Sequence, residues 1–106
     1  MVEWVVIVYD KPNTSRKGLR EEHLAAIGPN VEKGIVKNVG AIYHDIPTAD
    51  NRPFAGSSFN IEAESREEVI EFLKQDIFAK KGIWDIENAL IYPYGCVYRE
   101  AKKLSV

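Results

Sequence analysis

Residues 3–9 read Glu-Trp-Val-Val-Ile-Val-Tyr, a short run of β-branched and aromatic residues that ends at the turn sequence Asp10-Lys11-Pro12-Asn13. Composition and length predict a β-strand. Side chains alternate between the two faces of a strand, and here both sets are apolar: Trp4, Val6 and Val8 against Val5, Ile7 and Tyr9. We expect one face to meet helices. The other also needs a cover, which predicts a homodimer that packs through the sheet.

A helix is expected after this strand, with Thr14 or Ser15 as its N-cap. Helical spacing predicts one buried face for four of its residues, namely Leu19, His23, Ala26 and Ile27. The dipeptide Gly28-Pro29 is expected to interrupt the helix, because proline lacks an amide donor and restricts the residue before it. A further helical turn over residues 30–33 can follow before Gly34 ends it.

Alternating or β-branched residues predict three further strands, over residues 36–43, 57–63 and 86–92. Residues 44–56 form a long connection between the first two of these strands.

The capping-box spacing of Ser65 and Glu68 predicts a second helix that runs to about residue 75. The order is therefore strand, helix, strand, strand, helix, strand. It predicts an α+β, ferredoxin-like βαββαβ fold, in which a four-stranded antiparallel sheet has both helices on one face. We expect one domain over residues 1–94, followed by a C-terminal tail over residues 95–106 or an extra short strand at residues 96–99.

Composition excludes several classes of protein. The 106 residues include 14 Lys and Arg and 16 Asp and Glu, for a net charge of −2, and this balance argues against a nucleic-acid binder. No apolar run is long enough to cross a membrane, and the first residues are not typical of a secretory signal, so a cytoplasmic location is expected. With Cys96 as the single cysteine, neither a disulfide nor a cysteine-rich zinc site is expected.

Two residues are candidates for acid–base chemistry. His23 lies on the apolar face of its predicted helix, and histidine is the side chain best suited to proton transfer near neutral pH. The alternative is a core histidine bonded to a carbonyl group. Asp76 follows the second helix, where it either caps the next turn or meets His23, since both helices lie on one face of the sheet. In that second arrangement the carboxylate would fix the tautomer of the imidazole.

Two more residues are candidates for ligand binding. Ser57, after Gly56, opens a strand and either holds a substrate oxygen or serves the turn. Arg20 lies one helical turn before His23 and either binds an anion or is a solvated cation. The adjacent pair His44-Asp45 has no third ligand nearby, so no metal site is expected, and no glycine-rich loop predicts a nucleotide cofactor.

The sequence resembles the YCII-related (YciI-like) family over about residues 2–94. The resemblance depends on an ordered set of short motifs: Tyr9-Asp10-Lys11-Pro12, Arg20-x-x-His23-Leu24, Gly34, Gly40, Gly56-Ser57, Asp76-Ile77-Phe78 and Tyr92-Pro93. It implies a ferredoxin-like domain that dimerises through its sheet. It also implies a His–Asp dyad at His23 and Asp76, with Arg20 and Ser57 matching the family's arginine and serine.

This sequence departs from the family at two places. Ile77 stands where the family has proline after the aspartate, and Gly40-Ala41 stands where it has Gly-Pro. Neither position belongs to the dyad.

The resemblance implies little about substrate, although one characterised type is a dehydrochlorinase that acts on a chlorinated hydroxyquinol. We expect a small-molecule enzyme without cofactor or metal, in which His23 performs acid–base catalysis of an elimination or isomerisation on an anionic or phenolic ligand. The alternative is a non-catalytic ligand-binding or accessory module, in which the dyad is structural. An open polar pocket at one nitrogen of His23 favours the enzyme.

Overall fold

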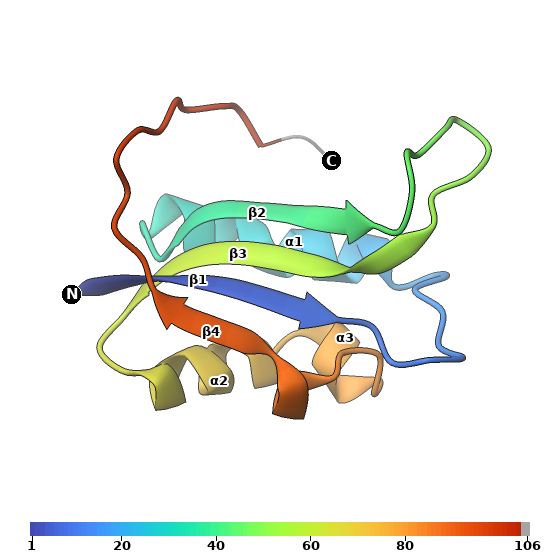
Figure 1. Ribbon diagram of the computed structural model, residues 1–106, viewed down its shortest axis with the longest axis horizontal. Helices are drawn as coiled ribbons and strands as arrows, with labels where there is room; N and C mark the ends of the chain where they lie inside the picture. Colours follow the sequence, from blue (N-terminus) through green and yellow to red (C-terminus); the bar gives the residue numbers. More distant parts are fainter. Residues whose placement is uncertain (105–106) are drawn as a thin grey trace.

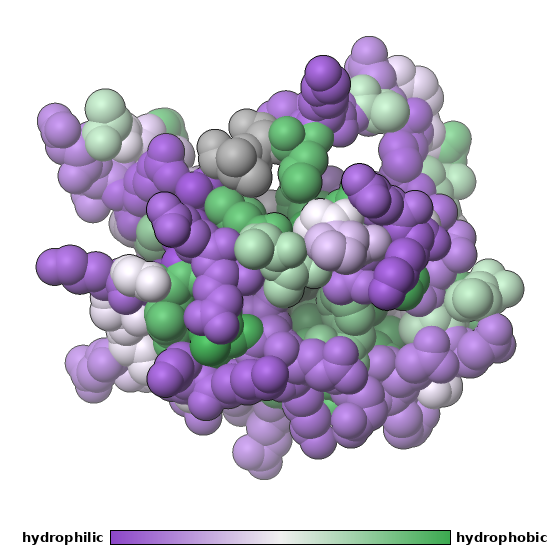
Figure 2. Space-filling view, turned by 180° about the vertical axis from the view of Figure 1, so that it is seen from behind, coloured by the Kyte–Doolittle hydropathy of each residue, from purple (hydrophilic) through white to green (hydrophobic). Residues whose placement is uncertain are grey.

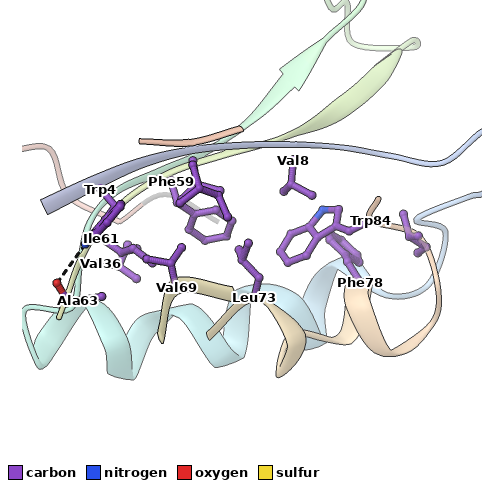
Figure 3. Packing of buried hydrophobic residues seen from close by; sticks show 13 residues of the cluster. Trp4, Val8, Val36, Phe59, Ile61, Ala63, Val69, Leu73, Phe78 and Trp84 are labelled. Carbon is purple, nitrogen blue, oxygen red and sulfur yellow. Dashed lines mark hydrogen bonds between the residues drawn. The ribbon is translucent and has the colours of Figure 1, made fainter. Parts of the chain in front are cut away.

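A computed structural model describes residues 1–104. Four antiparallel strands form one sheet in the order β2-β3-β1-β4, and the helices lie on one side of it (Figures 1 and 3). The predicted α+β fold with βαββαβ order is therefore confirmed. The elements are β1 (Val2–Tyr9), α1 (Arg20–Glu32), β2 (Val36–Tyr43), β3 (Phe54–Ala63), α2 (Arg66–Lys74), α3 (Ile77–Lys80), the 3-10 turn η1 (Ile86–Asn88) and β4 (Leu90–Pro93).

The hydrophobic core lies between the sheet and the helices. Trp4, Val6 and Val8 of β1 are buried there, and Val69 and Leu73 of α2 pack in the same cluster (Figure 3). The predicted burial of one face of the first strand is thus confirmed. Among residues 1–104, no helix is both long and apolar enough to cross a membrane.

The predicted N-cap of the second helix, Ser65, is confirmed. The side chain of Ser65 accepts a hydrogen bond of 3.2 Å from the backbone amide of Glu68, and α2 begins at the next residue, Arg66. This bond satisfies one of the amide groups that the first helical turn leaves unpaired.

The prediction for the first helix was wrong about its start and about an interruption at Gly28-Pro29, whereas its expected end before Gly34 is confirmed. α1 begins at Arg20, after an N-cap at Leu19 with no side-chain bond, because residues 14–16 have no regular structure and residues 17–19 form a turn. Pro29 lies inside α1 and does not interrupt it, since the residue is exposed and the amide of Lys33 still bonds to the Pro29 carbonyl. Ala26 is also exposed rather than buried.

Three strand predictions also need correction. β3 begins at Phe54 rather than residue 57, because Tyr43 pairs with Phe54 across a register irregularity and extends the hairpin. Residues 86–88 form η1, so the last strand is restricted to Leu90–Pro93. The described part of the tail, residues 94–104, contains no strand at residues 96–99, where the chain has left the sheet (Figure 1).

Pro29 gives a direct test of the continuous helix. Proline in a helix interior destabilises the folded protein by about 3 kcal/mol relative to alanine. Proline also lowers the conformational entropy of the unfolded chain, which offsets up to about 1 kcal/mol of that cost. We expect Pro29→Ala to raise the free energy of unfolding by about 1–2 kcal/mol, measured by urea denaturation. A lower free energy of unfolding in the variant would mean that Pro29 ends the helix.

Candidate active site

The centre of the candidate site is a hydrogen-bonded pair from two helices. Nδ1 of His23, on α1, lies 2.7 Å and 2.9 Å from the two carboxylate oxygens of Asp76, at the N-cap of α3. Asp76 Oδ1 also accepts a 2.9 Å bond from the backbone amide of Phe78. Both sequence interpretations of Asp76 are therefore correct, because one carboxylate caps α3 and meets His23.

The contacts with Asp76 determine which nitrogen of the His23 imidazole carries the proton. Because the Asp76 carboxylate can only accept hydrogen bonds, the network assigns a proton to Nδ1 of His23, which leaves Nε2 unprotonated in the neutral ring. Among residues 1–104, Nε2 has no hydrogen-bond partner. It is not sealed from solvent either, since the one buried side-chain polar atom without a partner in that part of the chain is Trp84 Nε1. His23 lines a cavity and can therefore present a basic nitrogen to a ligand.

Aromatic rings hold the imidazole in place. Phe78 stacks on His23 with ring centroids 4.2 Å apart, and Trp84 meets the imidazole edge-on at 5.8 Å. Phe78 and Trp84 are both buried in the core cluster, so the ring has little room to turn. The candidate base is thus oriented by packing as well as by Asp76.

Arg16 is a site residue that sequence reasoning missed. Its guanidinium group makes two bonds of 2.8 Å to the carboxylate of Asp10 and donates a 3.0 Å bond from Nη2 to Ser57 Oγ. It also lies over the rings of Phe54 and Phe78, with its Cζ 5.0 Å and 4.5 Å from their centroids. Only 9% of the side chain is exposed, and within residues 1–104 Nη1 makes no bond, so its two N–H groups are available to an anion in the cavity.

The two predicted ligand-binding residues have different positions. Ser57 is buried, lines the cavity and accepts the Arg16 bond, which leaves its hydroxyl proton for a ligand. Arg20 is exposed at the first residue of α1, on the rim of the same cavity. The family-matching Arg20 is therefore exposed, whereas Arg16 is a nearly buried cation that contacts the ring of Phe78, on which His23 also stacks.

The cavity lies between α1 and β2 and has a volume of about 1000 Å³. Residues of the C-terminal tail, from Arg99 to Leu104, form part of its wall. Seen from behind, hydrophobic surface gathers in the middle of this face of the protein, and hydrophilic surface surrounds it (Figure 2). Within residues 1–104, no group of three or more His, Cys, Asp or Glu side chains is arranged to hold a metal ion.

An ion pair fixes the start of the tail. Both Nη atoms of Arg99 bond to the carboxylate of Glu3 on β1, one of them at 3.0 Å, and Asn60 donates to the same carboxylate. The hydrogen bonds from Arg99 lower the pKa of Glu3 below its ordinary value. The ion pair between Arg99 and Glu3 therefore persists at pH values above the lowered pKa of Glu3, and it is lost only as the pH falls through that pKa.

Together these features define an α+β domain with a buried histidine–carboxylate pair that opens onto one cavity. The profile of the YCII-related domain family matches residues 2–89, and the chain belongs to that family.

Relatives cover most of the chain. It is 31% identical over 105 residues to aspercryptin biosynthesis cluster protein B of Emericella nidulans, across 95% of this chain and 67% of that protein. It is 32% identical over 95 residues to fusaric acid biosynthesis protein 2 of Gibberella fujikuroi, across 87% of this chain and 91% of the relative.

A solved structure has a similar fold. It is 5-chloro-2-hydroxyhydroquinone dehydrochlorinase (TftG) from Burkholderia phenoliruptrix in complex with 2,5-dihydroxybenzoquinone, with a TM-score of 0.73 and 24% sequence identity. The match covers 88% of this chain and 93% of TftG.

The substitution Asp76→Asn separates the two roles of Asp76. Asparagine caps helices as well as aspartate does, so α3 remains capped, but its amide group donates to Nδ1 of His23 instead of accepting from it. We expect the proton to move to Nε2, as measured by 15N NMR of the imidazole. His44, which is exposed in a loop, serves as the internal reference. An unchanged tautomer at His23 in the variant would show that Asp76 does not control it.

Proposed function

We propose that the protein is a small-molecule enzyme in which Nε2 of His23 acts as a general base and acid, oriented by Asp76. The observation that carries this proposal is Nε2, which has no hydrogen-bond partner within residues 1–104 and belongs to a cavity-lining ring whose other nitrogen is held by a carboxylate. Such a carboxylate fixes the tautomer and stabilises the imidazolium ion that forms when the base takes a proton.

The ligand is a small anion or phenol, and two groups that line the same cavity as His23 suit it. Nη1 of Arg16 and the hydroxyl group of Ser57 can donate to an oxygen that gains negative charge as its proton leaves. Arg20 on the rim adds a cation at the entrance. The reaction class is proton abstraction followed by elimination or isomerisation.

Elimination of hydrogen chloride illustrates the balance of such a step. In the keto tautomer, His23 takes the proton of a ring hydroxyl group, and the electron pair of that O–H bond forms a C=O bond. The adjacent C=C pair shifts by one bond to the tetrahedral carbon, and the C–Cl pair leaves with chloride. No electron acceptor is consumed. Support for this class comes from the fold shared with TftG, a dehydrochlorinase whose complex contains a dihydroxylated quinone.

The test is to measure proton abstraction directly. The full chain is incubated in D2O with 5-chloro-2-hydroxyhydroquinone and a panel of small enolisable ketones, and chloride release and deuterium uptake are followed. A positioned general base contributes about 10²–10⁴-fold, so His23→Gln should lower the rate by that factor. The matched control is His44→Gln, at the other histidine, which is exposed outside the cavity between α1 and β2.

Equal rates in wild type and His23→Gln would contradict the enzyme proposal. Binding of these compounds without any turnover would favour a ligand-binding module instead.

We also propose that the protein forms a homodimer through the open face of its sheet. On β1 the residues that alternate with the buried set are Val5, Ile7 and Tyr9, and β4 places Leu90 and Tyr92 beside Ile7 and Val5. Tyr9, Leu90 and Tyr92 are 47%, 40% and 56% exposed. A second copy that covers this apolar half of the face would remove it from water.

The dimer is tested by light scattering coupled to size-exclusion chromatography. We expect the mass of two chains for wild type and of one chain for Leu90→Lys, because the substitution places a charge among the apolar side chains of the open face. Val97→Lys is the matched control, since Val97 is fully exposed in the tail. A wild-type protein that stays monomeric at high micromolar concentration would refute the proposal.

A further inference from the structure

Half of the protein's basic residues gather around one cavity. Seven of its 14 Lys and Arg residues line the space between α1 and β2, whereas Glu100 is the one acidic residue among the lining residues. Arg16, Lys37 and Arg99 pair with carboxylates. The other four basic residues of the lining make no ion pair within residues 1–104; they are Lys17, Arg20, Lys102 and Lys103. For a protein with a net charge of −2, this concentration of positive charge indicates an anionic ligand.

The same cavity has an apolar wall. Leu24, Ile27 and Val31 of α1 line the cavity, and none of them belongs to the main hydrophobic cluster, although Ile27 is buried. Val36 and Val39 of β2 also line it, and Val36 belongs to that cluster. Apolar side chains of both α1 and β2 therefore border the cavity.

The cavity is longer than a single ring requires. His23 and Val31 are separated by eight residues of helix, which corresponds to about 12 Å at 1.5 Å per residue. A volume of about 1000 Å³ is at the upper end of the range for small-molecule sites. Leu104 of the tail approaches Gly28, so the tail borders the apolar end.

We propose that the ligand of this site is an amphipathic anion, with an acidic head group at Arg16 and His23 and an apolar chain along α1 toward Val31. The proposal rests on the proposed function, because it assigns the substrate class of the same site. The head group is a carboxylate or a comparably acidic enol, which the planar guanidinium group of Arg16 binds through Nη1. The apolar chain occupies the space between α1 and β2, and the tail closes over it.

The test uses straight-chain carboxylates from butanoate to decanoate, titrated into the full chain below their micelle concentrations and followed by NMR and calorimetry. Burying one methylene group contributes about 0.8 kcal/mol, so we expect affinity to rise about fourfold per added carbon until the chain reaches Val31. The alcohols of equal length should bind at least tenfold more weakly. Equal binding of alcohol and carboxylate, or affinity independent of chain length, would overturn the proposal.

A variant pair locates the apolar end. Val31→Asp should reduce the difference in affinity between decanoate and butanoate, because it places a charge where the end of the longer chain lies. Val31 is 37% exposed, so the fold should tolerate the change, which circular dichroism checks. The matched control is Val97→Asp, whose position is fully exposed and outside the cavity, and which should retain the difference. A full difference in Val31→Asp would contradict the placement.

Failure of this inference can be told apart from failure of the proposed function. If His23-dependent proton abstraction is observed and carboxylate binding does not depend on chain length, the amphipathic ligand is wrong and the acid–base site stands. If binding depends on chain length and His23→Gln leaves proton abstraction unchanged, the ligand class stands and the catalytic role is wrong.

Discussion

The arrangement of the site depends on one contact, the hydrogen bond between Nδ1 of His23 and the carboxylate of Asp76. It joins α1 to α3, which are separated by the whole β2–β3 hairpin and by α2. Asp76 is held at this point because it also caps α3 through the amide of Phe78. The start of α3 therefore positions both the carboxylate and the ring that stacks on His23, because Phe78 supplies the amide group that Asp76 caps and also the aromatic side chain.

Around that contact, hydrogen bonds and aromatic packing together hold the side chains of the site in place. Burying the Arg16 guanidinium group would be costly without partners, and Asp10 and Ser57 provide them while leaving Nη1 uncommitted. The ring of Phe78 contacts both Arg16 and His23. A base and a cation are thus fixed against the same aromatic side chain, beside a cavity that the main core does not fill.

The sequence predicts most of the fold because its strands and its second helix carry local signals. The apolar run of β1 and the capping box of Ser65 and Glu68 are read directly from neighbouring residues. The prediction that Pro29 interrupts the first helix is wrong because a helix tolerates a missing amide bond where the chain is exposed. No pattern of neighbouring residues reveals that exposure. Phe54 was assigned to a loop because its pairing with Tyr43 depends on a register irregularity in the hairpin.

The sequence predicts only the part of the site that lies on regular helices and strands. The contact between His23 and Asp76 could be anticipated once both helices were placed on one face of the sheet. Arg16 could not, because it lies in an irregular segment and its partners are far apart in the sequence, with Asp10 just after β1 and Ser57 within β3. Nor could the role of the tail be anticipated, because residues 99–104 reach the cavity without forming regular structure.

The most direct test of the account is the protonation of His23 in solution, measured by 15N NMR of the wild-type imidazole with and without salicylate, a phenolic anion. The account predicts that in the neutral imidazole Nδ1 carries the proton and Nε2 does not, and that the Nε2 resonance shifts when salicylate binds. A neutral ring protonated at Nε2 in the free protein, or an Nε2 resonance that does not change when salicylate binds, would contradict the claim that this nitrogen is the base of the site.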